Sequence, residues 1–135
     1  MKKFKLLSLL LVLFISLTGC SKANANEISS VASNFVASSL SYDFNAAKQY
    51  CTGEALDSAN LVEAYVSFTA ISAKVSEVKI LNIETSKNYA DVQAFAKRTV
   101  TTESSTTEEN KTLLLKMVNL NDAWYVYDVS TLTFE

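Results

Sequence analysis

The chain has 135 residues, of which 49% are hydrophobic and 19% charged, with 12 basic and 14 acidic side chains. It contains no histidine, which excludes histidine-based nucleophilic triads, imidazole acid–base catalysis and imidazole metal sites. Two cysteines and two glycines are too few for a four-thiolate metal site, a disulfide framework or a glycine-rich phosphate loop. We therefore expect a single domain that uses no metal and no cofactor.

The first twenty residues have the three-part organisation of a secretory signal. Three lysines lie near the start, an apolar run follows from Leu6 to Leu17, and small residues lead to Cys20. The run is shorter than the roughly 20 residues that span a bilayer, which favours a cleaved signal over a transmembrane helix. Leu17-Thr18-Gly19-Cys20 resembles the lipobox of bacterial lipoproteins. The resemblance implies removal of residues 1–19, acylation of Cys20, and anchoring to lipid at the extracytoplasmic side of the cell membrane.

Residues 20–26 are predicted to be the lipidated cysteine and a short polar tether, and residues 27–135 a single domain. Beyond residue 19 the chain keeps nine basic and 14 acidic side chains, a net charge of −5, so no nucleic-acid partner is expected. Once Cys20 is acylated, Cys51 has no disulfide partner and no histidine to activate it. We expect Cys51 to be a buried structural thiol.

Between residues 27 and 72, apolar side chains recur at three- and four-residue spacing, which predicts amphipathic helices. Asp43 is the expected N-cap of a short second helix that ends at Gly53. The first helix is expected to have Asn26 as its N-cap and an apolar stripe of Ile28, Val31, Ala32, Phe35 and Leu40. The third helix is expected after Asp57, with a packed face of Leu61, Tyr65 and Phe68.

After Ala73 the period changes to two, which predicts four strands near residues 75–85, 88–101, 111–120 and 123–132. Ser86-Lys87 and Asn121-Asp122 are the expected hairpin turns, and they would place Ile83 opposite Ala90 and Met117 opposite Val126. The polar run from Thr102 to Glu109 is predicted to be a solvated loop, because its three glutamates, Glu103, Glu108 and Glu109, lack the spacing of a calcium loop. The inner sheet face would consist of Leu81, Ile83, Ala90, Val92, Ala94, Ala96, Leu113, Leu115, Met117, Trp124 and Val126.

Helices followed by an antiparallel meander predict an α+β domain with N-terminal helices packed on one face of the sheet. The segment from Ser39 to Tyr50, in which Asp43 precedes Phe44, resembles the helix-to-helix segment of NTF2-like, or cystatin-like, domains of small bacterial lipoproteins. The segment from Asn121 to Val126 resembles the last hairpin of the same group. The resemblance implies a curved four-stranded sheet bent into a cone around the helices. Such domains are variously enzymes, ligand binders or assembly adaptors, so the fold alone does not select a function.

Arg98, the only arginine of the chain, is the main candidate for contact with a ligand. The predicted register places Arg98 opposite Leu115, which itself lies opposite Asp128, so that Arg98 and Asp128 would flank Leu115 at the mouth of the cone. Arg98 would bind a carboxylate or another anion there. In the structural alternative, Arg98 and Asp128 form an ion pair at the rim that contributes little stability.

The outer sheet face is predicted to be a contact surface, because aromatic and aliphatic side chains interrupt the polar alternation expected of a solvated face. Its apolar members are Val78, Ile80, Tyr89, Phe95, Leu114, Val118, Leu120, Tyr125, Tyr127 and Val129. We expect a membrane-anchored interaction or assembly module, and no enzyme, that forms a homodimer or binds an envelope protein through this face.

Two other functions remain open. The first is binding of a small anionic or apolar molecule in a cone pocket lined by Phe35, Phe68, Leu115 and Trp124. The second is a proton-shifting enzyme that would use Asp128 with Tyr125 or Tyr127.

Overall fold

The computed structural model describes residues 24–132, so the predicted signal segment and Cys20 lie outside the described residues. Residues 24–40 are helical, followed by α2 (Phe44–Ala47), the short 3₁₀ helix η1 (Lys48–Tyr50) and α3 (Gly53–Ser67). Four strands follow: β1 (Ser72–Ser86), β2 (Tyr89–Thr101), β3 (Thr106–Leu120) and β4 (Ala123–Leu132). None of the described helices is long and apolar enough to cross a membrane.

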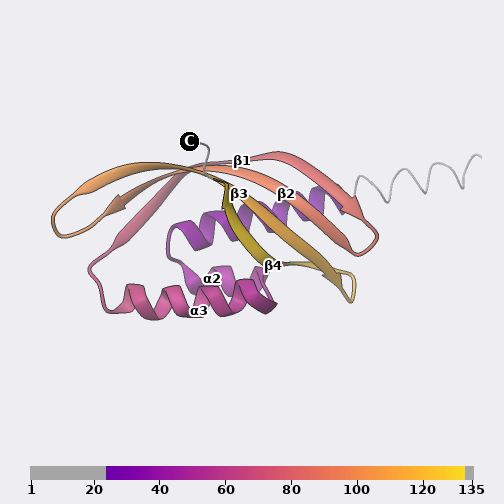
Figure 1. Cartoon of the computed structure of the whole chain (residues 1–135), viewed down its shortest axis with the longest axis horizontal. Coiled ribbons are helices and arrows are strands. Elements are labelled where there is room, and N and C mark those ends of the chain that lie inside the picture. Colours follow the sequence, from indigo (N-terminus) through magenta and orange to yellow (C-terminus); the bar gives the residue numbers. More distant parts are fainter. Residues whose placement is uncertain (1–23, 133–135) are drawn as a thin grey trace, which may run out of the picture.

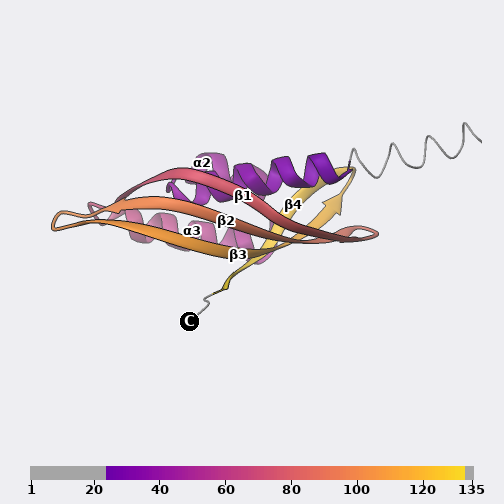
Figure 2. The same ribbon diagram turned by 90° about the horizontal axis from the view of Figure 1, so that it is seen from above.

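The strands form one antiparallel meander in the order β1-β2-β3-β4, and the sheet arches over the helices in Figure 1. Seen from above in Figure 2, β4 is turned away from the direction of β1, β2 and β3, so the sheet curves around the helical layer. The predicted α+β architecture, with helices on one face of a curved four-stranded sheet, is confirmed.

Of three helix ends predicted from the sequence, one is confirmed and two are wrong. Asp43 caps α2 as predicted, because its carboxylate accepts a hydrogen bond from the Ala46 N–H at 3.2 Å. Asn26 is not an N-cap, since the helix already includes residue 24. Gly53 does not end a helix but begins α3, with a left-handed φ of 56°. The glycine allows the chain to turn into α3 directly after Thr52, whose N–H donates to the Val126 carbonyl of β4 at 2.8 Å.

The first hairpin differs from the prediction in its turn and in two bulges. The turn residues are Lys87 and Asn88, so Ile83 lies opposite Val92 and not Ala90. Register shifts between Val75 and Glu77 and between Ile80 and Asn82 leave Ser76 and Leu81 without partners. Leu81 was predicted to face inward and is 54% exposed, whereas Val78 and Ile80, predicted to face outward, pack against the core.

The last hairpin is as predicted near its turn and shifted further along. Asn121 and Asp122 form the turn with φ angles of 53° and 65°, and Met117 lies opposite Val126, which confirms the predicted register there. A third register shift, between Lys116 and Met117, places Asp128 opposite Lys116 and Val129 opposite Leu115. Val129 therefore belongs to the inner face, where it packs against the core, and Asp128 to the outer face.

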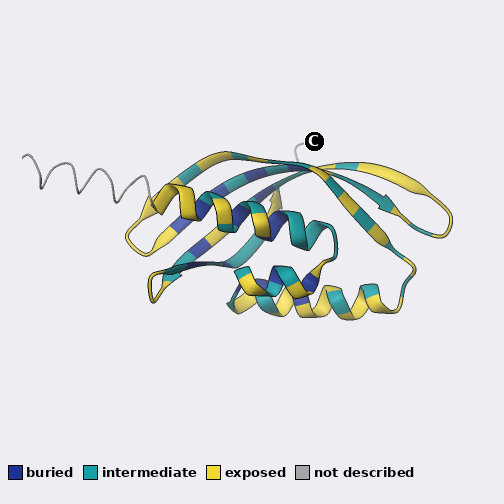
Figure 3. Ribbon diagram, turned by 180° about the vertical axis from the view of Figure 1, so that it is seen from behind, coloured by how far each residue is buried: buried dark blue, intermediate teal, exposed yellow. Residues whose placement is uncertain are grey.

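The core lies between the first helix and the inner face of the sheet. The largest fully buried side chains are Ile28, Leu115, Met117, Val36, Val92 and Val126. The alanines of β2, which are at most 2% exposed, let the first helix approach the sheet closely. Figure 3 shows the contrast between this buried layer and α3, along most of which the ribbon is coloured as exposed or intermediate.

The packed face of α3 was predicted incorrectly. The buried residues of α3 are Ala55 and Ala59, whereas Leu61, Tyr65 and Phe68 are 73%, 65% and 90% exposed. Ala55, Ala59 and the half-buried Leu56 therefore face the rest of the domain and Val62 borders a cavity, whereas Leu61, Tyr65 and Phe68 face away.

Candidate functional site

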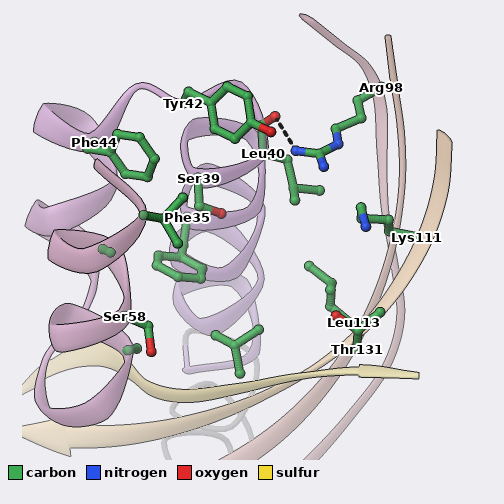
Figure 4. A pocket seen from close by; sticks show the side chains of 14 residues that line it. Phe35, Ser39, Leu40, Tyr42, Phe44, Ser58, Arg98, Lys111, Leu113 and Thr131 are labelled. Atoms are coloured by element: carbon green, nitrogen blue, oxygen red, sulfur yellow. Dashed lines mark hydrogen bonds between the residues drawn. The ribbon is translucent and has the colours of Figure 1, made fainter. Parts of the chain in front are cut away.

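A cavity of about 310 Å³ lies between the helices and the concave face of the sheet. Figure 4 shows that its wall combines helical side chains on one side with side chains from the strands on the other. The lining residues are Phe35, Ser39, Leu40, Tyr42, Phe44, Ala55, Ser58, Ala59, Val62, Arg98, Lys111, Leu113, Val129 and Thr131. Most of these side chains are apolar, and the two that carry charge are both cations.

Arg98 is held at the cavity by three contacts. Its Nε donates to Oε2 of Glu109 at 2.8 Å, and its Nη1 donates to the Leu40 carbonyl at 3.0 Å (Figure 4). The guanidinium carbon also lies 5.4 Å from the centroid of the Tyr42 ring, within cation–π range. Because Leu40 is at the carboxyl end of the first helix, Arg98 satisfies a terminal carbonyl where the helix dipole is negative.

The hydrogen-bonding capacity of Arg98 is only partly used. A guanidinium has five N–H donors, and the two contacts to Glu109 and Leu40 occupy two of them. The side chain is 11% exposed, so its remaining donors lie close to the cavity and away from bulk water. An anionic group in the cavity would find donors there at little cost in lost hydration.

Lys111 adds a second cation on the same wall. It lies on the inner face of β3 opposite Ala96, and its Nζ is 3.8 Å from the same Glu109 oxygen that pairs with Arg98. Two cations therefore share one carboxylate, and this cluster has an excess of one positive charge. The residues that line the cavity include no aspartate and no glutamate, so the field in the cavity favours an anion.

The sequence placed Arg98 on the correct face but gave it the wrong partner. Arg98 lies opposite Glu109 and not Leu115, because β3 begins at Thr106 and only residues 102–105 connect it to β2. The register differs from the predicted one by six residues, an even number, which leaves Arg98 on the inner face. Asp128 is on the outer face opposite Lys116, so the predicted Arg98–Asp128 constellation is wrong. Glu109, predicted to lie in a solvated loop, is the partner of Arg98.

The predicted pocket lining is correct for one residue of four. Phe35 lines the cavity, whereas Leu115 is fully buried in the core and Phe68 is exposed on the far side of α3. Trp124 is buried and does not border the cavity. The sequence analysis missed Lys111, although alternation back along β3 from Leu113 would have placed both Lys111 and Glu109 on the inner face.

The remaining candidate residues do not form a second site. Cys51 is a free thiol and buried, as predicted, and burial raises its pKa against a smaller opposing effect of Lys48. A protonated, buried thiol is a poor nucleophile. Among residues 24–132, no group of three or more cysteine, aspartate or glutamate side chains is arranged to hold a metal ion.

The helices of residues 24–132 lie on the concave side of the sheet (Figures 1 and 2), and Gly53, the first residue of α3, lies beside Tyr127 of β4. Tyr89 is 57% exposed, and its ring meets that of Tyr127 edge to face with the centroids 6.2 Å apart. Phe95, Tyr125 and Tyr127 are half-buried. That this face binds a partner stays a prediction.

These features define the class of the domain: helices covering the concave face of an antiparallel meander, with a cavity between the two layers. The domain has a cystatin-like fold, as shown by its similarity to a protein of unknown function with that fold from Nostoc punctiforme. The two chains are 12% identical, with a TM-score of 0.53, and the match covers 79% of this chain and 88% of that chain. The intermembrane space region of the chloroplast protein ARC6 is also similar, at 13% identity and a TM-score of 0.64 over 83% of this chain and 96% of that chain. No family model and no curated protein matches the sequence.

Proposed function

We propose that this chain is a membrane-anchored extracytoplasmic lipoprotein whose domain binds a small anionic amphipathic molecule, a carboxylate with a short alkyl body, in the cavity. The observation that carries the proposal is the distribution of charge: Arg98 and Lys111 stand at one side of an otherwise uncharged, largely apolar lining. The alkyl body would contact Phe35, Leu113 and their neighbours, and the carboxylate would accept hydrogen bonds from the free donors of Arg98 and from Lys111.

The lining favours binding over catalysis. The residues that border the cavity offer no carboxylate, and the chain has no histidine, so a general base for proton abstraction is missing from the lining. The volume of about 310 Å³ is at the small end of the range of ligand pockets, which limits the ligand to a compact molecule.

Binding is tested with octanoate and its neutral counterpart, 1-octanol, titrated into the isotopically labelled protein and followed by backbone amide chemical shifts. We expect octanoate to bind more tightly and to shift the amides of residues that line the cavity. Lys111→Met should weaken octanoate binding about tenfold and leave octanol binding unchanged, because only the anion uses the lost charge.

Lys116→Met is the matched control, since Lys116 is on the same strand but exposed on the outer face. It should leave both affinities unchanged. Equal affinity for octanoate and octanol, or shifts confined to surfaces outside the cavity, would contradict the proposal.

The anchoring half of the proposal rests on the lipobox-like sequence that ends at Cys20. Cys20→Ala should leave an unprocessed precursor or release the protein from membranes, as read by fractionation and by the mass of the product. A variant that is processed and membrane-bound like the parent would show that Cys20 is not the anchor.

An interaction module is the second candidate, and exposed apolar side chains favour it. Leu61, Tyr65 and Phe68 on α3 and Tyr89 on the sheet are each more than half exposed. Exposed apolar patches of more than a few hundred Å² usually mark association surfaces. The two candidates are compatible, because Leu61, Tyr65, Phe68 and Tyr89 do not line the cavity.

A further inference from the structure

The apolar stripe of α3, which we define as Leu61, Tyr65 and Phe68, lies on one side of the last two turns of that helix. The spacing of four and three residues places the three side chains above one another on the helix surface. All three point away from the domain, since they are 73%, 65% and 90% exposed. No described residue covers them, so the stripe has a large apolar surface in contact with water.

The stripe has few charged neighbours: the exposed Asp57 lies one turn before Leu61, and the remainder of its surroundings is nearly neutral. From residue 58 to residue 73 the sequence contains a single charged residue, Glu63, which forms an ion pair with Lys48 of η1. The exposed neighbours of the stripe, Asn60, Ala64 and Ser67, are neutral. A strongly charged partner or an anionic lipid surface would find no complementary charge here, whereas two copies of the same neutral patch meet without repulsion.

The stripe is also self-complementary. If two copies of α3 cross antiparallel about a twofold axis near Ala64 and Tyr65, Leu61 of each copy lies beside Phe68 of the other, and the two Tyr65 side chains flank the axis. The acidic first turn, with Glu54, then lies roughly 30 Å along the axis from its equivalent in the second copy, at 1.5 Å per residue. The like charges stay apart, and the helix dipoles run in opposite directions.

The stripe supplies the apolar centre of such a contact. A large aromatic side chain buries roughly 150–250 Å², so Tyr65, Phe68 and Leu61 at their observed exposures present roughly 400–500 Å². This is more than half of the roughly 800 Å² that each partner contributes to a standard interface. The neutral neighbours Asn60, Ala64 and Ser67 extend the contact around this centre.

We propose that the apolar stripe of α3 is the surface through which two copies of this chain associate. The inference goes beyond ligand binding in the cavity and assigns the homodimer contact to α3, where the sequence had suggested the outer sheet face.

The test is thiol crosslinking of the full-length chain in isolated membranes. Ala64→Cys places an exposed thiol near the expected twofold axis, and a short thiol-to-thiol crosslinker should convert the variant to a covalent dimer. Glu54→Cys is the matched control on the same helix and should give roughly tenfold less dimer, because its equivalents lie far apart. The parent chain, with Cys20 and Cys51, sets the background.

A second substitution tests whether the apolar stripe itself stabilises the contact between two copies. Adding Phe68→Ser to Ala64→Cys should lower the dimer yield about tenfold, since a central aromatic anchor is lost. Because Phe68 is 90% exposed, the variant should keep the thermal stability of the parent, and it should bind octanoate as the parent does.

Three outcomes would overturn the proposal. The first is an Ala64→Cys dimer yield no higher than that of the parent. The second is efficient dimer formation by Tyr89→Cys in its place, which would assign the contact to the outer sheet face. The third is crosslinking of Ala64→Cys to a different protein only, which would make α3 a surface for another partner. None of these outcomes bears on octanoate binding, so this proposal and the cavity proposal fail separately.

Discussion

The first helix and α3 carry the same kind of sequence signal and have opposite environments. In the first helix the apolar stripe is buried, with Ile28, Ala32 and Val36 fully inaccessible and Phe35 4% exposed. In α3 the large apolar side chains of Leu61 and Tyr65, and that of Phe68 directly after the helix, are exposed, whereas Ala55 and Ala59 are buried and Leu56 is half-buried. An apolar stripe therefore predicts that a helix face packs against an apolar surface, but it does not show whether that surface belongs to the same chain.

The difference follows from the order of the layers. The first helix packs beneath the sheet, whereas α3 lies at the edge of the domain, farther from the arch of the sheet, and packs against β4 (Figure 1). Alanines are enough to pack α3 against its neighbours, because small side chains allow close approach. The large side chains of α3 then remain available for contact with another molecule.

The largest effect that we expect separates Phe35 in the first helix from Phe68 in α3. Phe35→Ala should lower the free energy of unfolding by about 3 kcal/mol, because a buried ring is lost and its space is only partly refilled. Phe68→Ala should change it by less than about 0.5 kcal/mol in the monomer. Urea denaturation of both variants at low protein concentration makes the comparison. A loss of similar size at Phe68 would mean that the ring is covered within its own chain.

Much of the fold could be predicted because its signals are local. The change of period after Ala73, the Asn121-Asp122 turn and the Asp43 cap each depend on a few neighbouring residues, and each is correct. The three bulges could not be predicted, because one extra residue at Ser76, Leu81 or Tyr127 leaves the alternation before and after it intact. The loop after β2 was predicted too long, because the threonines and glutamates of residues 106–109 are polar and yet form an exposed part of β3.

The candidate site was predictable in part for the same reason. Alternation along β2 placed Arg98 on the concave face, and the structure agrees. Its partner depended on the number of loop residues between two strands, which composition does not determine. Glu109 and the contact with the Leu40 carbonyl therefore became visible only in the structure.

A smaller effect on stability is expected from the same substitution, alanine to leucine, in each of the two helices. Ala32→Leu inserts a larger side chain where the first helix meets the sheet, and it should cost about 1–3 kcal/mol of stability through overpacking. Ala64→Leu, on the exposed side of α3, should be close to neutral for folding and should strengthen self-association if the stripe is the dimer contact. Thermal unfolding and sedimentation across a concentration series measure the two effects independently. A stabilising Ala32→Leu would mean that the space between helix and sheet is not filled.

The smallest expected effect is the pH dependence that comes from the buried thiol of Cys51, directly before α3. The comparison is with an exposed thiol on α3, introduced by Ala64→Cys. Burial raises the pKa of Cys51 above its ordinary value of 9.0, with Lys48 acting weakly in the other direction. The folded state therefore holds this proton more tightly than the unfolded state does. The resulting contribution to stability is complete below pH 9 and is lost as the pH rises through the folded pKa.

Cys51→Ala should accordingly show a shallower loss of stability between pH 8 and about pH 10 than the parent, because the variant lacks this thiol and is otherwise identical. At pH 8, Cys51 should react with iodoacetamide more slowly than the exposed thiol of Ala64→Cys, because thiolate is the reactive form and burial disfavours it. Equal alkylation rates at the two positions would show that the segment joining η1 to α3 opens readily. The hydrogen bond from the Thr52 N–H to the Val126 carbonyl of β4 indicates that the start of α3 is held firmly on the domain. Equal rates would contradict that interpretation.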